Sequence, residues 1–237
     1  MCRYHGNENQ YSQQSSSSSP SSLPRILQAL IRMERKAEND YHLIQSRLVQ
    51  IKEMESILNK LIVTHIDSDN YVDYLFKRAE QLSGHLETYE NIIGKIDIGE
   101  PIRKNFKQIS FEFIEYLKRK IEFKSVWIES MELIEMGRQT IKEKVMKLDD
   151  FKQTIDDAYE NGEYFRLSEQ KTEFDQQLDQ MNNLVDNCFQ SGQQSKELSS
   201  ILHDKLTELE SNFQHIVRES MDKINDIKRT SARITTC

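Results

Sequence analysis

The chain has 237 residues and a net charge of −7, and it contains only seven glycines and three prolines. So few turn-forming residues argue against sheets, barrels and nucleotide-binding folds, and the negative charge argues against general binding to nucleic acid. We therefore predict an all-α protein with no nucleic acid among its partners.

Residues 1–23 form the first predicted segment, a disordered, serine-rich tail. Its polar composition offers too little apolar surface to offset the entropy lost on ordering. From residue 24 onward, apolar residues recur at steps of three and four, which is typical of one helix face. The first helix is predicted over about 25–64, because residues 64–70 include several good N-cap residues that indicate a turn.

The second predicted helix, about 70–97, has the most regular heptad seam in the chain. Gly99 suits the end of a helix and Pro101 suits the first turn of the next one. A third helix is therefore predicted to begin near residue 102 and to continue without a break to about residue 159.

Two further helices are predicted after a turn signal at residues 160–163. One covers about 164–190 and the other about 194–229, with glycine and polar residues between them indicating another turn. Residues 231–237 are predicted to fray.

The second and fourth predicted helices are related by a shift of 92 residues, which places Leu75 on Leu167 and Leu86 on Leu178. Such repetition indicates two copies of one supersecondary unit. The long third helix then belongs to both copies. This predicts two tandem three-helix bundles, at 24–130 with helices 25–64, 70–97 and 102–130, and at 131–230 with helices 131–159, 164–190 and 194–229.

This arrangement resembles tandem spectrin repeats over about residues 24–230. Residues 126–133, around Trp127, are similar to the first-helix core of that family, and residues 169–188 are similar to its second helix. Phe213 stands where the third helix usually has an aromatic residue. The resemblance implies a cytoskeletal or membrane-skeleton role.

The heptad pattern also predicts which side chains form the core. They share seam positions on the predicted helices. The predicted core residues are Leu75, Leu82, Leu86, Tyr89, Ile93, Trp127, Phe174, Leu178, Met181, Val185 and Phe213.

The sequence contains no pattern typical of catalysis or metal binding. Its six histidines and three cysteines lack the usual zinc-ligand spacing, and there is no glycine-rich phosphate loop. Cys188 continues an apolar seam and is predicted to be a buried small hydrophobe. We expect no catalytic residues, no metal, no cofactor and no small-molecule substrate.

Charge is uneven along the chain, with 11 lysines and arginines against seven carboxylates over residues 102–147. The most basic cluster is Lys118, Arg119, Lys120 and Lys124. It could dock an acidic protein such as actin or tubulin, or anionic lipid. A solvated face that pairs with neighbouring helices is the favoured interpretation.

These patterns favour a non-enzymatic spectrin-like rod that acts as a spacer or scaffold for protein partners. We expect it in the cytoplasm, at the cytoskeleton or an organelle surface, with direct membrane binding disfavoured and a homodimer left open. One alternative is a membrane-binding helical dimer of the BAR type, although five helices fit its three long kinked helices poorly. The second alternative is an elongated coiled-coil tether or adaptor.

Overall fold

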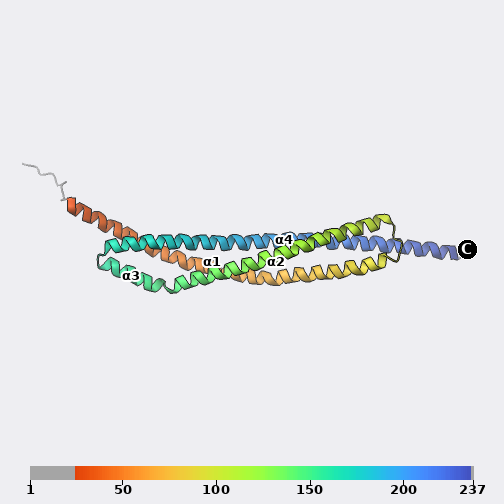
Figure 1. The fold of residues 1–237 in the computed structure, drawn as a ribbon, viewed down its shortest axis with the longest axis horizontal. Coiled ribbons are helices and arrows are strands. Elements are labelled where there is room, and N and C mark those ends of the chain that lie inside the picture. Colours follow the sequence, from red (N-terminus) through yellow and green to blue (C-terminus); the bar gives the residue numbers. More distant parts are fainter. Residues whose placement is uncertain (1–24, 236–237) are drawn as a thin grey trace, which may run out of the picture.

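The computed structural model describes residues 25–235, and these are almost entirely helical (Figure 1). No strand occurs within this range. The described helices are α1 (Arg25–Ile93), α2 (Glu100–Met146), α3 (Leu148–Glu160) and α4 (Tyr164–Thr235). The predicted N-terminal tail, residues 1–23, lies outside the described residues.

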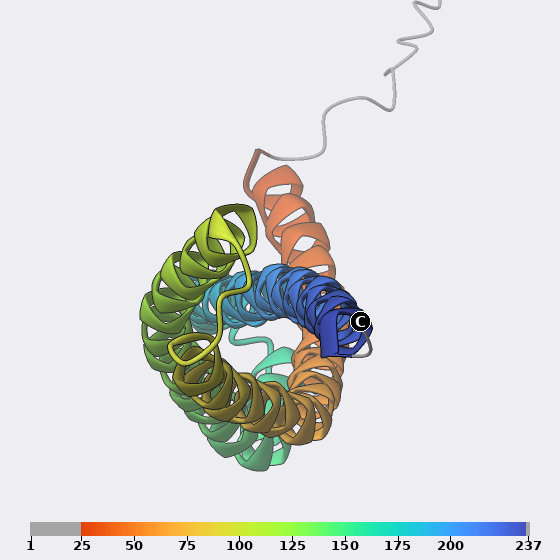
Figure 2. The same ribbon diagram turned by 90° about the vertical axis from the view of Figure 1, so that its right-hand side faces the viewer.

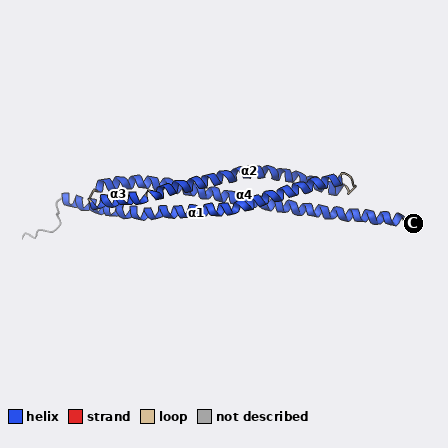
Figure 3. Ribbon diagram, turned by 90° about the horizontal axis from the view of Figure 1, so that it is seen from below, coloured by secondary structure: helices blue, strands red, loops and turns tan. Residues whose placement is uncertain are grey.

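The helices form one elongated three-helix bundle. The chain runs out along α1, returns along α2 and α3, and runs out again along α4 (Figure 1). The end-on view in Figure 2 shows the helices grouped around a common long axis. The C-terminal part of α4 projects beyond the turn between α1 and α2 (Figure 3). The shape is therefore a rod.

The interior contains two apolar clusters, arranged one after the other along the rod, and each draws on all three layers of the bundle. The first joins the N-terminal half of α1 to the C-terminal part of α2, to α3 and to the N-terminal half of α4. The second joins the C-terminal half of α1 to the N-terminal part of α2 and the C-terminal half of α4. We name them the proximal core and the distal core.

Two of the predicted turns are confirmed. Gly99 precedes α2 with φ of 88° and Pro101 lies in its first turn. Gly162 has φ of 69° in the turn between α3 and α4. Both glycines adopt the left-handed region, which other residues rarely enter.

The predicted turn at residues 64–70 is wrong, because α1 continues through it. Thr64 Oγ1 donates to Lys60 O at 2.9 Å, and Ser68 Oγ donates to Thr64 O at 2.8 Å. These hydroxyls therefore bond the preceding helical turn and do not cap a new helix. The buried face of α1 also keeps its seven-residue spacing through this segment, since Leu58, His65 and Val72 are all buried.

The predicted turn after residue 190 is also wrong, because α4 is continuous from Tyr164 to Thr235. Gly192 is buried in the bundle, where a Cβ would lie 3.3 Å from Leu61 Cδ1 and 3.5 Å from Ile134 Cδ1. The glycine thus permits close packing of helices and does not end one. Residues 231–235, predicted to fray, belong to the same helix.

The predicted unbroken helix over 102–159 is interrupted once, at Lys147 between α2 and α3. The Lys147 amide donates to Lys144 O at 3.0 Å, a tighter turn than an α-helix makes. The seam again keeps its phase, because Ile141, Leu148 and Ile155 are buried at intervals of seven. No glycine or proline marks this break.

The described helices do not pack as the predicted bundles 24–130 and 131–230. Each core combines segments from the beginning, middle and end of the chain. α1 and α4 lie side by side in parallel, and their hydrogen-bonded pairs are about 130 residues apart, for example Arg78 with Glu210. The shift of 92 residues therefore reflects the common heptad period of two neighbouring helices.

Candidate functional site

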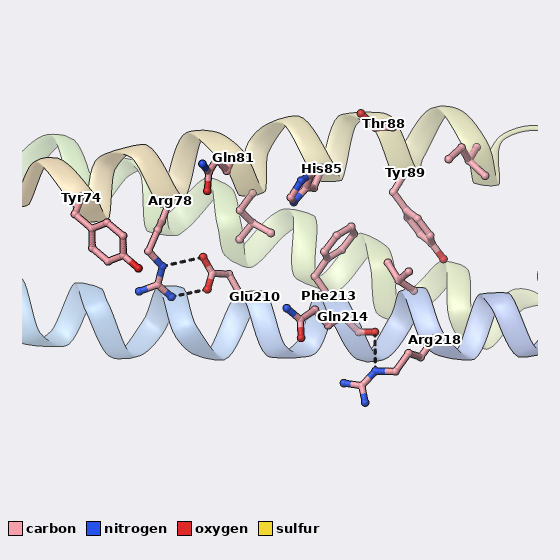
Figure 4. Close-up of a pocket in the computed structure, with 13 residues that line it drawn as sticks. Tyr74, Arg78, Gln81, His85, Thr88, Tyr89, Glu210, Phe213, Gln214 and Arg218 are labelled. Atoms are coloured by element: carbon pink, nitrogen blue, oxygen red, sulfur yellow. Dashed lines mark hydrogen bonds and ion pairs between the residues drawn. The ribbon is translucent and has the colours of Figure 1, made fainter.

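A groove lies between α1 and α4 beside the distal core, and we name it the α1–α4 groove (Figure 4). It has a volume of about 760 Å³. Leu82, Tyr89 and Phe213 supply an apolar floor. The groove lining is Tyr74, Arg78, Gln81, Leu82, His85, Thr88, Tyr89, Ile92, Glu210, Phe213, Gln214, Val217 and Arg218.

One end of the groove is closed by an ion pair between the two helices. Arg78 Nε donates to Glu210 Oε1 at 3.2 Å, and its Nη2 donates to Glu210 Oε2 at 2.5 Å (Figure 4). Arg78 Nη2 also donates to Thr207 Oγ1 at 3.2 Å. The hydrogen bond to Glu210 raises the pKa of Arg78. This bidentate pair fixes the spacing of α1 and α4.

Tyr116 of α2 is buried in the distal core. Burial raises the pKa of its phenol to about 12. The charge of Arg78 lowers this pKa, and the charge of Glu210 raises it. The hydroxyl has no hydrogen-bond partner among the described residues. It therefore stays protonated at physiological pH and supplies no nucleophile.

The other polar groups of the groove lie on its rim. The ring of His85 is parallel to that of Phe213, with centroids 6.4 Å apart. Arg218 Nε donates to Gln214 O at 3.3 Å. The hydroxyl of Tyr89, a floor residue, instead pairs with the buried Ser220. An apolar floor with a hydrogen-bonding rim suits an apolar side chain or helix of a partner.

The four cations of the predicted basic cluster all lie on α2 but differ in exposure. Lys118 is exposed and pairs with Glu115 at 2.7 Å, while Lys120 is half-buried with its Nζ 4.5 Å from the Phe76 ring centre. Burial lowers the pKa of Lys120, and Glu80 on α1 partly offsets this effect. Arg119 and Lys124 are exposed. Lys120 and Lys124 are one helical turn apart on the same face of α2, and the charge of Lys124 also lowers the pKa of Lys120. The role of the cluster as a docking surface stays a prediction.

All the predicted core residues are buried, in two groups. Trp127, Phe213 and the predicted residues of α1 lie in the distal core. The four predicted residues of α4 between 174 and 185 lie in the proximal core. Cys188 is also fully buried, and burial raises the pKa of its thiol. Cys2 and Cys237 lie outside the described residues.

Within residues 25–235, no three His, Cys, Asp or Glu side chains gather closely enough to hold a metal ion. No described helix has a stretch apolar enough to cross a bilayer.

Sequence reasoning did not identify Arg78 and Glu210 as partners. They are separated by 132 residues, and each occurs among many similar charged residues. Only the parallel pairing of α1 and α4 brings them together.

Comparison of the chain with protein-family models, curated proteins and solved structures finds no match.

Proposed function

We propose that this chain is a non-enzymatic structural protein, a helical rod that serves as a spacer or scaffold for protein partners. The observation that supports this proposal most directly is that α1 and α4 are each continuous over most of the rod. α4 alone has 72 residues, which corresponds to about 108 Å of helix. Because α1 and the pair α2 and α3 cover most of this length, the bundle can hold attached partners at a defined separation.

The proposed partners are cytoskeletal or membrane-skeleton proteins, as the resemblance to spectrin repeats implies, with a cytoplasmic location at such structures. The α1–α4 groove is the proposed docking site. Its apolar floor would receive the apolar face of a partner helix, and its rim would supply hydrogen bonds.

The first test is shape and mass in solution, by light scattering combined with small-angle X-ray scattering on the full chain. We expect a monomeric mass and a long, straight particle about three helices wide, with a maximum dimension of at least about 110 Å. A compact particle would contradict the spacer. Co-sedimentation with actin filaments, with wild type and with R218E in the groove rim, then tests one proposed partner.

A second candidate is the membrane-binding dimer of the BAR type, and two observations favour it. The chain forms three long layers with a break at Lys147 in the middle layer, where the sequence indicated five shorter helices. α2 also exposes the apolar side chains of Phe111, Ile114 and Ile121. The net charge of −7 opposes anionic membranes. A dimeric mass, a curved profile and co-sedimentation with anionic vesicles would support this candidate over the spacer.

A further inference from the structure

A buried polar layer separates the proximal core from the distal core. Each of the three long helices contributes one polar residue at a seam position where an apolar residue would complete the core. His65 of α1 is 5% exposed, and Ser130 of α2 and Ser195 of α4 are fully buried. We name these three residues the polar layer.

Close contacts next to the layer show that its three members lie at the same level of the rod. Gly192 of α4 packs against Leu61 of α1 and Ile134 of α2, so these three residues form one level. One helical turn along parallel α1 and α4 leads to His65 and Ser195. The same step along antiparallel α2 leads to Ser130.

The polar layer is incompletely hydrogen-bonded. His65 Nε2, Ser130 Oγ and Ser195 Oγ are all buried, and none has a hydrogen-bond partner among the described residues. A buried polar group without a partner costs about 1–3 kcal/mol relative to one that is paired. The polar layer is therefore less stabilising than an apolar layer of the same size would be.

His65 is also held against the single tryptophan of the chain. Its ring is stacked on Trp127 with centroids 4.2 Å apart and planes 13° from parallel. The indole Nε1 donates to Asp69 Oδ1 at 3.1 Å. The stack thus joins α1 to α2 at the boundary between the two cores.

The surroundings of the ring favour neutral imidazole. Burial lowers the pKa of His65 from its ordinary value of 6.5, and Asp69 on α1 opposes this effect in part. α2 places the neutral indole of Trp127 against the ring, and Ser130 and Ser195 bring uncharged hydroxyls to its level. The charged neighbours of these serines in sequence, Glu129 and Lys196, are exposed.

We propose that the polar layer is a pH-operated joint: neutral His65 joins the two cores into one stiff rod, and its protonation loosens the middle of the bundle. The direction follows from linkage. A histidine whose pKa is lower in the folded state binds more protons when unfolded, so it destabilises the fold as the pH falls below 6.5. The loosening therefore begins as the pH falls below about 6.5, and it persists at lower pH.

Trp127 provides a direct reporter, because a protonated imidazole quenches the fluorescence of an indole stacked on it. We expect the emission of the full chain to fall on acidification with a midpoint below 6.5, and this step to be absent in H65L. The matched control is H215Q, since His215 is exposed on α4 and its ring lies beside Glu219. A midpoint at or above 6.5, or an unchanged step in H65L, would overturn the proposal.

The mechanical consequence is tested separately. We expect X-ray scattering to show a straight rod at pH 7.5 and a shorter, bent average at pH 5.5 in wild type, with H65L straight at both. We also expect the thermal midpoint of wild type to fall on this acidification by about 2–4 °C more than that of H65L. H65Q, which keeps a neutral polar group, should behave like H65L. Equal pH responses in all three proteins would contradict the joint.

Discussion

Two glycines inside helices illustrate opposite roles for the same residue. Gly137 of α2 faces α4 so closely that a Cβ would lie 2.5 Å from Cys188 Sγ. Gly84 of α1 is exposed, and nothing lies within 4 Å of the corresponding position. Packing requires the first glycine, whereas no contact requires the second.

We expect G137A to lower the free energy of unfolding by about 1–3 kcal/mol, because overpacking outweighs the better helix propensity of alanine. G84A should raise it by about 0.5–1 kcal/mol. Urea denaturation measures both. Combining G137A with C188A should recover part of the loss, and strict additivity of the two changes would contradict the proposed contact.

At the scale of elements, α1 and α4 are longer than their local sequence indicates. α1 and α4 each pass through a segment rich in polar residues or glycine without a break. In both segments the buried residues keep their seven-residue spacing. Packing of the helix before and after the segment therefore holds the segment itself in a helix. Local propensity is too weak to reverse this.

Proline substitutions test the continuity of these two helices. S68P and Q193P should each cost about 3 kcal/mol or more, because proline removes a helical hydrogen bond and clashes with the preceding turn. E100P is the control, since residue 100 begins α2, where proline is tolerated. Thermal melts followed by circular dichroism compare the three. Tolerance of S68P or Q193P would restore the predicted turns.

At the scale of the whole molecule, the two cores share every long layer of the bundle. α1 and α4 each run through both cores, and α2 reaches from the distal core into the proximal one. Loss of one core therefore removes packing from helices that also build the other. We expect the rod to unfold as a single cooperative unit.

The substitution L178D tests this coupling. Leu178 lies in the proximal core and Trp127 in the distal core. A buried unpaired charge costs several kcal/mol, so L178D should lower the midpoint reported by Trp127 fluorescence as well as that of total helicity. D179N, at an exposed neighbouring residue, should leave both unchanged. A normal Trp127 transition in L178D would indicate independent bundles.

Heptad spacing predicted much of the architecture. The all-helical class, the buried residues Leu86 and Leu178, and the turns at Gly99 and Gly162 follow from local patterns. The seam intervals of seven through His65 and Ser195 were also present in the sequence. This spacing is the local signal for the continuity of α1 and α4, and it outweighs the capping residues that indicated turns.

The sequence by itself determined that amphipathic helices with narrow seams form here, because a seam depends only on residues close together in the chain. It could not determine which helices pair, because every seam repeats with the same period and fits several partners. Only the tertiary structure decided that α1 lies parallel to α4, and so brought Arg78 to Glu210 and His65 to the level of Ser130 and Ser195. The physical reason is that these pairs depend on the register between distant helices, which is set by turn positions and by close approaches such as those at Gly137 and Gly192.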